Sequence, residues 1–175
     1  MPQTTHPAAV DPALRILQKT YGFDAFRGTQ AGVISHVVTG GHAFVLMPTG
    51  GGKSLCYQIP SLMREGVGIV ISPLIALMQN QVDALKELGI RAAAINSSMT
   101  GASIASTKDD MLRGLIDLVY VAPERLLMDD FLALLDEVPV ALFAIDEAHC
   151  VSQWGHDFRR EYRELTILHE RWPRV

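Results

Sequence analysis

The sequence has little cysteine, no excess of positive charge and no long apolar run, and each absence excludes a class of protein. Its two cysteines, Cys56 and Cys150, have no CxxC spacing, so we expect reduced thiols of a cytoplasmic protein and neither disulfides nor a zinc site. The net charge of −4 gives no general attraction for nucleic acid, so any DNA contact must come from a local patch or from other parts of the protein. No apolar run approaches the roughly 18 residues of a membrane-spanning helix, and the N-terminus lacks a secretory pattern. We therefore expect no membrane partner.

The sequence does contain enough apolar surface for a packed core. Hydrophobic residues make up 49% of the 175 positions and charged residues 19%, which is typical of a globular protein and not of a disordered one. Residues 1–12 carry three prolines and should form a flexible tail. Residues 13–175 have a length that suits one domain.

Apolar runs of strand length alternate with segments of helical spacing along this domain. We expect strands at His42–Met47, Val67–Ile71, Arg91–Ile95, Ile116–Val121 and Val138–Ile145. We expect helices at Ala13–Thr20, Gly28–Thr39, Leu55–Arg64, Leu74–Leu88, Ala102–Arg113, Pro123–Leu135 and Phe158–Arg171. Because the strands have no polar face, both sides of the sheet should be covered, which predicts an α/β fold with a doubly wound parallel sheet. Ligands of such sheets bind beyond the carboxyl ends of the strands, so residues that carry chemistry should follow strands.

A glycine-rich segment follows the first expected strand. It reads Met47, Pro48, Thr49, Gly50, Gly51, Gly52, Lys53, Ser54. Such a turn before a helix points backbone N–H groups at phosphate oxygens; Lys53 would reach the β- and γ-phosphates and Ser54 would place its hydroxyl on Mg²⁺. The strict pattern has glycine at the position of Met47. An ordinary turn with a surface lysine is the alternative, but the flanking strand and helix favour a phosphate site.

An acidic pair, Asp146-Glu147, follows the most apolar expected strand. Beside a phosphate loop, the first carboxylate of such a pair holds Mg²⁺, usually through water, and the second positions and deprotonates the attacking water. Asp146 is therefore the metal candidate and Glu147 the candidate base. Alone, an acidic pair in this place is as often a helix N-cap, but its combination with Lys53 and Ser54 favours the catalytic interpretation.

Four stretches of the chain resemble the RecQ helicases, in the order and spacing of that family. They are Met47–Pro60, Ser72–Met78, Ala122–Leu126 and Asp146–Arg159. The resemblance extends roughly from Leu14 to the C-terminus. Two motifs within it, Cys-Tyr-Gln-Ile-Pro and Gln-Trp-Gly-His-Asp-Phe-Arg, separate RecQ from other DEAH-box helicases. It implies the first of two RecA-like lobes of an ATP-driven, Mg²⁺-dependent 3′→5′ motor, which unwinds duplex DNA from a single strand during recombination and repair at the nucleoid.

The resemblance also implies an adenine site in the aromatic turn before the second expected helix. Residues 26–30 match the adenine-recognition motif of the family, with Gly28 where proline is frequent. The amide of Gln30 can pair with the N6/N7 edge of adenine, Phe23 would stack on the base, and Arg27 would lie close by. The alternative places Phe23 and Phe26 in the core and Gln30 at the surface as an ordinary amide.

DNA contacts are expected in two places. The loop after the acidic pair interleaves aromatic and basic residues, which suits single-stranded DNA, and the resemblance implies roles for Trp154, Phe158 and Arg159. Packing of these aromatic residues under the last helix is the alternative. Ser72 and Leu74 match a family segment that lies along the DNA strand, although Ser-Pro after a strand is also an ordinary turn.

In the family, the first lobe continues into a further strand with a Ser/Thr-Ala-Thr motif, which this sequence does not contain. We expect a truncated lobe without its second RecA-like lobe, binding ATP·Mg²⁺ weakly and hydrolysing it barely, because an arginine finger usually stabilises the γ-phosphate. The bare sheet edge should favour association. A non-catalytic nucleotide- or DNA-binding module is the alternative. A GTPase is disfavoured, since the sequence has no Asn-Lys-x-Asp.

Overall fold

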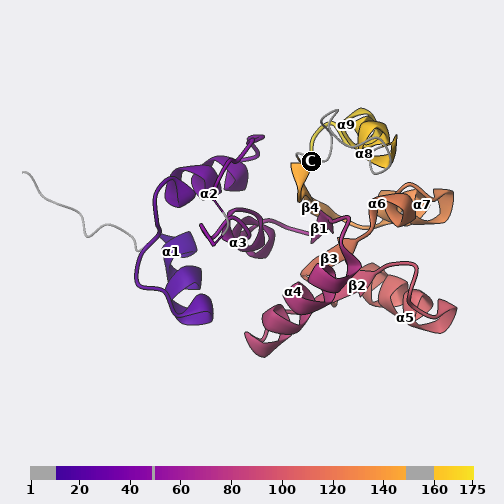
Figure 1. The fold of residues 1–175 in the computed structure, drawn as a ribbon, viewed down its shortest axis with the longest axis horizontal. Coiled ribbons are helices and arrows are strands. Elements are labelled where there is room, and N and C mark those ends of the chain that lie inside the picture. The colour runs from indigo at the N-terminus through magenta and orange to yellow at the C-terminus, as the bar shows by residue number, and fades with distance from the viewer. Residues whose placement is uncertain (1–10, 49, 149–159) are drawn as a thin grey trace, which may run out of the picture.

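The computed structural model describes residues 11–48, 50–148 and 160–175 and confirms an α/β fold (Figure 1). The strands are β1 (Val67–Ile71), β2 (Ala92–Ile95), β3 (Leu118–Val121) and β4 (Val140–Ile145). All pairs in the sheet are parallel, and the strand order is β2-β3-β1-β4. The helices are α1 (Pro12–Ile16), the π-helical η1 (Leu17–Tyr21), α2 (Gln30–Val38), α3 (Leu55–Met63), α4 (Ile75–Glu87), α5 (Gly101–Leu112), α6 (Pro123–Leu126), α7 (Asp129–Glu137), α8 (Arg160–Glu164) and α9 (Thr166–Arg171).

Helices cover both faces of the sheet, as the unbroken apolar strands predicted. Every residue of β1 is buried. Ile69 and Ile71 pack against apolar side chains of α5, α6, α7, α8 and α9. Val70 points the other way and packs against α4 and partly buried residues of α3. Alternate side chains of one strand thus join two separate cores, which explains why no position in it is polar.

The first three helices form a smaller unit around α3, at one end of the molecule (Figure 1). Its own core consists of Ala13, Leu17, Ile34, Leu55 and Ile59. Because α3 also contacts β1 and β4, it joins this N-terminal unit to the sheet.

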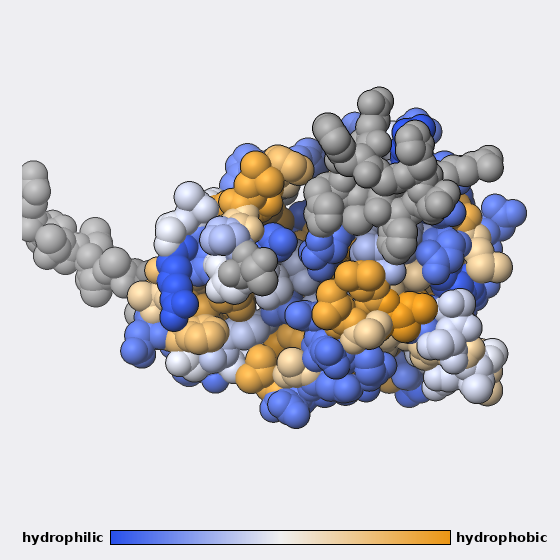
Figure 2. Space-filling model, viewed as in Figure 1, coloured by the Kyte–Doolittle hydropathy of each residue, from blue (hydrophilic) through white to orange (hydrophobic). Residues whose placement is uncertain are grey.

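The strand predicted at His42–Met47 is wrong. These residues form no ladder with any strand in the described part of the chain. Phe44 and Leu46 are 77% and 83% exposed, and apolar side chains reach the surface in several places on the face that Figure 2 shows. An apolar run becomes a strand only where a neighbour accepts its backbone hydrogen bonds. Instead, residues 42–47 and β4 line a common open cavity of about 750 Å³.

Two predicted helices are divided in the structure. The segment Pro123–Leu135 forms α6 and α7, because Met128 between them has an extended backbone (φ −70°, ψ 137°). At the C-terminus, α8 and α9 are separate helices on either side of Leu165, and Phe158, where one helix was predicted to begin, lies outside the described residues.

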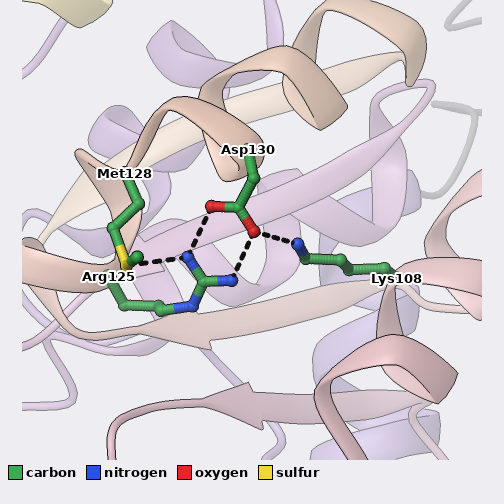
Figure 3. Close-up of polar contacts among 4 residues, drawn as sticks. All are labelled: Lys108, Arg125, Met128 and Asp130. Atoms are coloured by element: carbon green, nitrogen blue, oxygen red, sulfur yellow. Dashed lines mark hydrogen bonds and ion pairs between the residues drawn. The ribbon is translucent and has the colours of Figure 1, made fainter. Parts of the chain in front are cut away.

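A cluster of ion pairs holds the division between α6 and α7 (Figure 3). Asp130, in the first turn of α7, accepts two hydrogen bonds of 2.8 Å from the guanidinium of Arg125 in α6. It also accepts one of 2.5 Å from Lys108 in α5. A carboxylate at a helix N-terminus is favourable in itself, and here it also ties three helices together.

Candidate nucleotide-binding site

The glycine-rich segment forms a tight turn that ends at α3. Gly50 and Gly52 have left-handed backbones (φ 79° and 75°), which side chains other than glycine rarely adopt. The Gly51 N–H donates a 2.9 Å hydrogen bond to the Pro48 carbonyl, and a Cβ on Gly51 would lie 2.9 Å from that same oxygen. The turn and the helix of the predicted phosphate loop are therefore present, while the strand before them is not. Thr49 lies outside the described residues.

Lys53 lies on the same cavity as the acidic pair. The cavity of about 750 Å³ beside β4 is lined by Met47 and Lys53 from the loop and by Asp146 and Glu147 after β4. Ser54 follows Lys53 directly and is the N-cap residue of α3. Residues far apart in the sequence thus line one cavity along β4 and its carboxyl end. Ser54 is not among the residues that line it.

The backbone holds the acidic pair in a strained turn. The Asp146 N–H donates to the Ile71 carbonyl (2.9 Å), and the Asp146 carbonyl accepts a hydrogen bond from the Tyr162 hydroxyl (3.1 Å). The next residue, Glu147, has φ 54°, which among the described residues is the one positive φ outside glycine. Such a backbone costs about 1–2 kcal/mol and clusters at functional sites. A 2.9 Å bond from the Glu147 N–H to Asp146 Oδ1 stabilises it.

Gln30 is buried and bonded to the loop, so it is not a surface amide. It is 3% exposed. Its Oε1 accepts a 2.8 Å hydrogen bond from the Arg27 N–H, and its Nε2 donates to the carbonyls of Gly52 (3.0 Å) and Gly51 (3.4 Å). These bonds fix which end of the amide is oxygen and which is nitrogen. The oxygen keeps a second lone pair, whereas both amide hydrogens are used, and a ligand would take a donor only by displacing the long contact to Gly51.

A small cavity of about 90 Å³ lies between this amide and the aromatic turn. Phe23, Arg27, Gln30 and the glycines at positions 50–52 line it. Phe23 is 46% exposed, and the Arg27 guanidinium lies 5.9 Å from the centre of its ring. Phe26 instead packs against the N-terminal core. Phe26 is therefore a core residue, whereas Phe23 is exposed enough for a base to stack on it.

Of the residues predicted to contact DNA, the structure describes Ser72 and Leu74, which differ in exposure. Ser72 is 3% exposed directly after β1, so its side chain is buried, and its contact with DNA stays a prediction. Leu74 is 40% exposed just before α4 and lies at the surface. Trp154, Phe158 and Arg159 lie outside the described residues.

Sequence reasoning missed a polar network behind the loop, in which Gln58 of α3 bonds to Tyr21 and Tyr120. Burial, followed by the neighbouring Tyr120, raises the pKa of both Tyr21 and Tyr57. One signal was available: Gln58 falls beside Leu55 and Ile59 on the apolar side of α3, where a polar residue needs an internal partner.

The described residues contain no group of three or more His, Cys, Asp or Glu side chains arranged to hold a metal ion. Any divalent cation here would therefore depend on few protein ligands together with oxygens of a bound phosphate. No helix in the described ranges is both long and apolar enough to cross a bilayer.

Known proteins resemble this chain over most of its length. Residues 27–173 match the family described as DEAD/DEAH box helicase. The chain is 50% identical over 157 residues to the ATP-dependent DNA helicase RecQ of Bacillus subtilis (strain 168), covering 89% of this chain and 27% of that protein. It is 46% identical over 161 residues to the RecQ helicase of Haemophilus influenzae, covering 92% and 26%. The chain thus spans about a quarter of the length of these relatives.

A more distant eukaryotic protein and a solved structure extend the likeness. ATP-dependent helicase SGS1 of Saccharomyces cerevisiae is 40% identical over 174 residues, covering 94% of this chain and 12% of that protein. The crystal structure of a hypothetical ATP-dependent RNA helicase from Sulfolobus tokodaii superposes with a TM-score of 0.56 at 17% identity, covering 89% of this chain and 53% of the other. At that identity the superposition shows a shared fold and nothing more.

Proposed function

This chain belongs to the DEAD/DEAH box helicase family and is similar to its RecQ members, and we propose that it is the ATP-binding lobe of a RecQ-type DNA helicase. In the whole protein, the lobe couples ATP hydrolysis to 3′→5′ movement along single-stranded DNA and to duplex unwinding in recombination and repair. The observation that carries the proposal is the shared cavity of Lys53, Asp146 and Glu147.

Each residue around the cavity has a task that its chemistry suits. The glycine turn and the start of α3 offer backbone N–H groups to phosphate, and Lys53 adds a positive charge for the β- and γ-phosphates. Ser54 and Asp146 would hold Mg²⁺, which would neutralise phosphate charge when bound. Glu147 accepts a proton from the attacking water. Its strained backbone and the bonds on Asp146 support a fixed geometry for the pair.

The amide of Gln30 supplies the preference for adenine. Its bonds to Arg27 and Gly52 orient it. Its oxygen accepts from N6 of adenine, and its nitrogen donates to N7 in place of the long contact to Gly51, whereas guanine presents two acceptors there. Phe23 stacks on the base from the exposed side of the small cavity. The base site and the phosphate site thus meet at the same glycine loop.

Nucleotide binding by the purified chain tests the proposal. Titration calorimetry with ATP and GTP, each with Mg²⁺, compares wild type with Lys53→Ala and Gln30→Ala. We expect wild type to prefer ATP, Lys53→Ala to lose about tenfold to a hundredfold in affinity for both nucleotides, and Gln30→Ala to lose the preference. Lys86→Ala, at the exposed end of α4, is the matched control and should bind as wild type does. Equal affinity for ATP and GTP in wild type contradicts the proposal.

A further inference from the structure

A network of tyrosine and glutamine side chains, buried at its centre and partly exposed at its ends, connects the two ends of the proposed site. The Tyr21 hydroxyl donates to Gln58 Oε1 (3.2 Å), and Gln58 Nε2 donates to the Tyr120 hydroxyl (3.1 Å). Gln58 Nε2 also reaches Gln81 Oε1 of α4 (3.3 Å), and the hydroxyls of Tyr57 and Tyr120 lie 3.3 Å apart. Gln58 is the hub, since its amide bonds to three separate elements: η1, β3 and α4.

The interior leaves this hub little freedom. Gln58 is 4% and Tyr120 is 1% exposed, so water does not offer alternative partners. The hydrogen bonds of Gln58 use its oxygen and its nitrogen in three directions. Polar groups in such surroundings are held by one another, and losing one partner leaves the others unsatisfied. Bonds of this kind can fix the relative position of the elements that carry them.

The position of the network relates it to both ends of the nucleotide. Tyr21 is the last residue of η1 and precedes the exposed Phe23 by two positions, across the left-handed Gly22. Gln58 lies one turn of α3 beyond Ser54. The bond between Tyr21 and Gln58 is thus a polar link between the aromatic turn at the base site and the helix at the phosphate site. Tyr120 connects both to the centre of the sheet.

We propose that Gln58, oriented by Tyr21 and Tyr120, is a positioning residue that sets the span between the adenine site and the phosphate loop. The inference rests on the proposed function and deepens it. A ligand with both a base and a phosphate chain gains from two sites only when the sites are held at the matching distance. A ligand that has the phosphate chain alone does not depend on that distance.

This difference defines the experiment. The Mg²⁺ complexes of ATP and of inorganic tripolyphosphate are titrated into wild type, Tyr21→Phe and Gln58→Met. Tyr21→Phe removes one hydroxyl and keeps the ring, and Gln58→Met removes the amide and keeps the length of the side chain. The affinity for ATP should fall roughly threefold in Tyr21→Phe and about tenfold in Gln58→Met, while the affinity for tripolyphosphate stays within about twofold.

Ser61→Ala is the matched control, because Ser61 bonds to the Tyr57 carbonyl within α3 and to none of the side chains of the network. Both ligands should bind it as they bind wild type. Equal losses of ATP and tripolyphosphate, or unchanged ATP affinity in both variants, overturn the inference. If Gln58→Met fails to fold, Tyr21→Phe decides alone. If wild type binds ATP no better than GTP, the proposed function itself fails. If wild type prefers ATP and the variants bind ATP as wild type does, only the inference about Gln58 fails.

Discussion

The two flanks of the sheet differ in how completely other elements pack against them. Over β1, β2 and β3, one face of the sheet is covered by α5, α6 and α7, and Asp130 joins all three helices through Lys108 and Arg125. On the β4 side, residues 42–47 have no partner strand among the described residues, and they line a cavity of about 750 Å³ together with β4.

The proposed phosphate and proton chemistry lies on the less complete flank, while the proposed base site lies in the smaller cavity. Lys53, Asp146 and Glu147 face the cavity, and the strained backbone of Glu147 lies there as well. Packing supplies the free energy of folding on one side and leaves loops free to meet a ligand on the other, in line with the general finding that binding loops belong to the less stable parts of a protein. We therefore expect substitutions on the packed flank to lower stability and substitutions on the open flank to change ligand binding or association.

The largest effect is expected from Phe131→Ala in α7, on the packed flank. Phe131 is completely buried in the core between the sheet and α7. Its loss should lower the free energy of unfolding by about 3–5 kcal/mol, as measured by urea denaturation. The control is Leu112→Ala, at a position that is 50% exposed. A loss below about 1 kcal/mol for Phe131→Ala would remove the distinction between the flanks.

A smaller effect on stability, with a clear effect on binding, is expected from Gly52→Ala. The left-handed backbone (φ 75°) opposes a side chain by about 1–2 kcal/mol, and the added Cβ would lie 2.2 Å from Gln30 Nε2. Both the amide and the loop must then move, so ATP affinity should fall together with the melting temperature. The comparison variant is Gly32→Ala, where a Cβ meets nothing within 4 Å. Unchanged ATP affinity in Gly52→Ala would show that the glycine loop is not part of the ATP site.

Asp130→Asn tests the ion pairs of the packed flank through their dependence on pH. Hydrogen bonds from Arg125 and then Lys108 hold the pKa of Asp130 well below its usual 3.8. A lowered pKa in the folded state stabilises above pH 3.8, and this contribution is lost as the pH falls below it. Because the Asp130 side chain is 50% exposed, we expect no more than about 1 kcal/mol. Urea denaturation of both proteins at pH 7 and pH 3 measures the difference, which should be smaller at pH 3.

The smallest effect on stability is expected from the double variant Phe44→Ser, Leu46→Ser on the open flank. Both side chains are largely exposed, so the free energy of unfolding should change by less than about 0.5 kcal/mol. Exposed apolar residues beside a bare strand edge favour contact between copies, so association should decrease. Sedimentation velocity at increasing concentration measures this. A wild-type chain that stays monomeric throughout would show that the edge does not attract a second copy.

Much of the fold was predictable from local pattern. The unbroken apolar runs at Val67–Ile71 and Ile116–Val121 contain β1 and β3, because strands covered on both faces cannot carry polar residues. The order of elements predicted a parallel sheet with its chemistry beyond the strand ends. The glycines of the loop were informative for the same local reason, since only glycine fits their backbone without cost.

The errors share one physical origin. Residues 42–47 are as apolar as a true strand, but a strand also needs a neighbour, which no local pattern contains. The break at Met128 depends on Asp130 meeting residues of two other helices. Likewise, the buried amides of Gln30 and Gln58 follow from partners brought from elsewhere in the chain.

Composition and local pattern by themselves therefore determined which segments can be strand, helix or phosphate turn, because these depend on backbone preference and on the side chains nearby. Only the tertiary structure decided which apolar run is paired, which polar residue is enclosed and which charges share a cavity. These outcomes depend on distances between residues that the order of the chain leaves open.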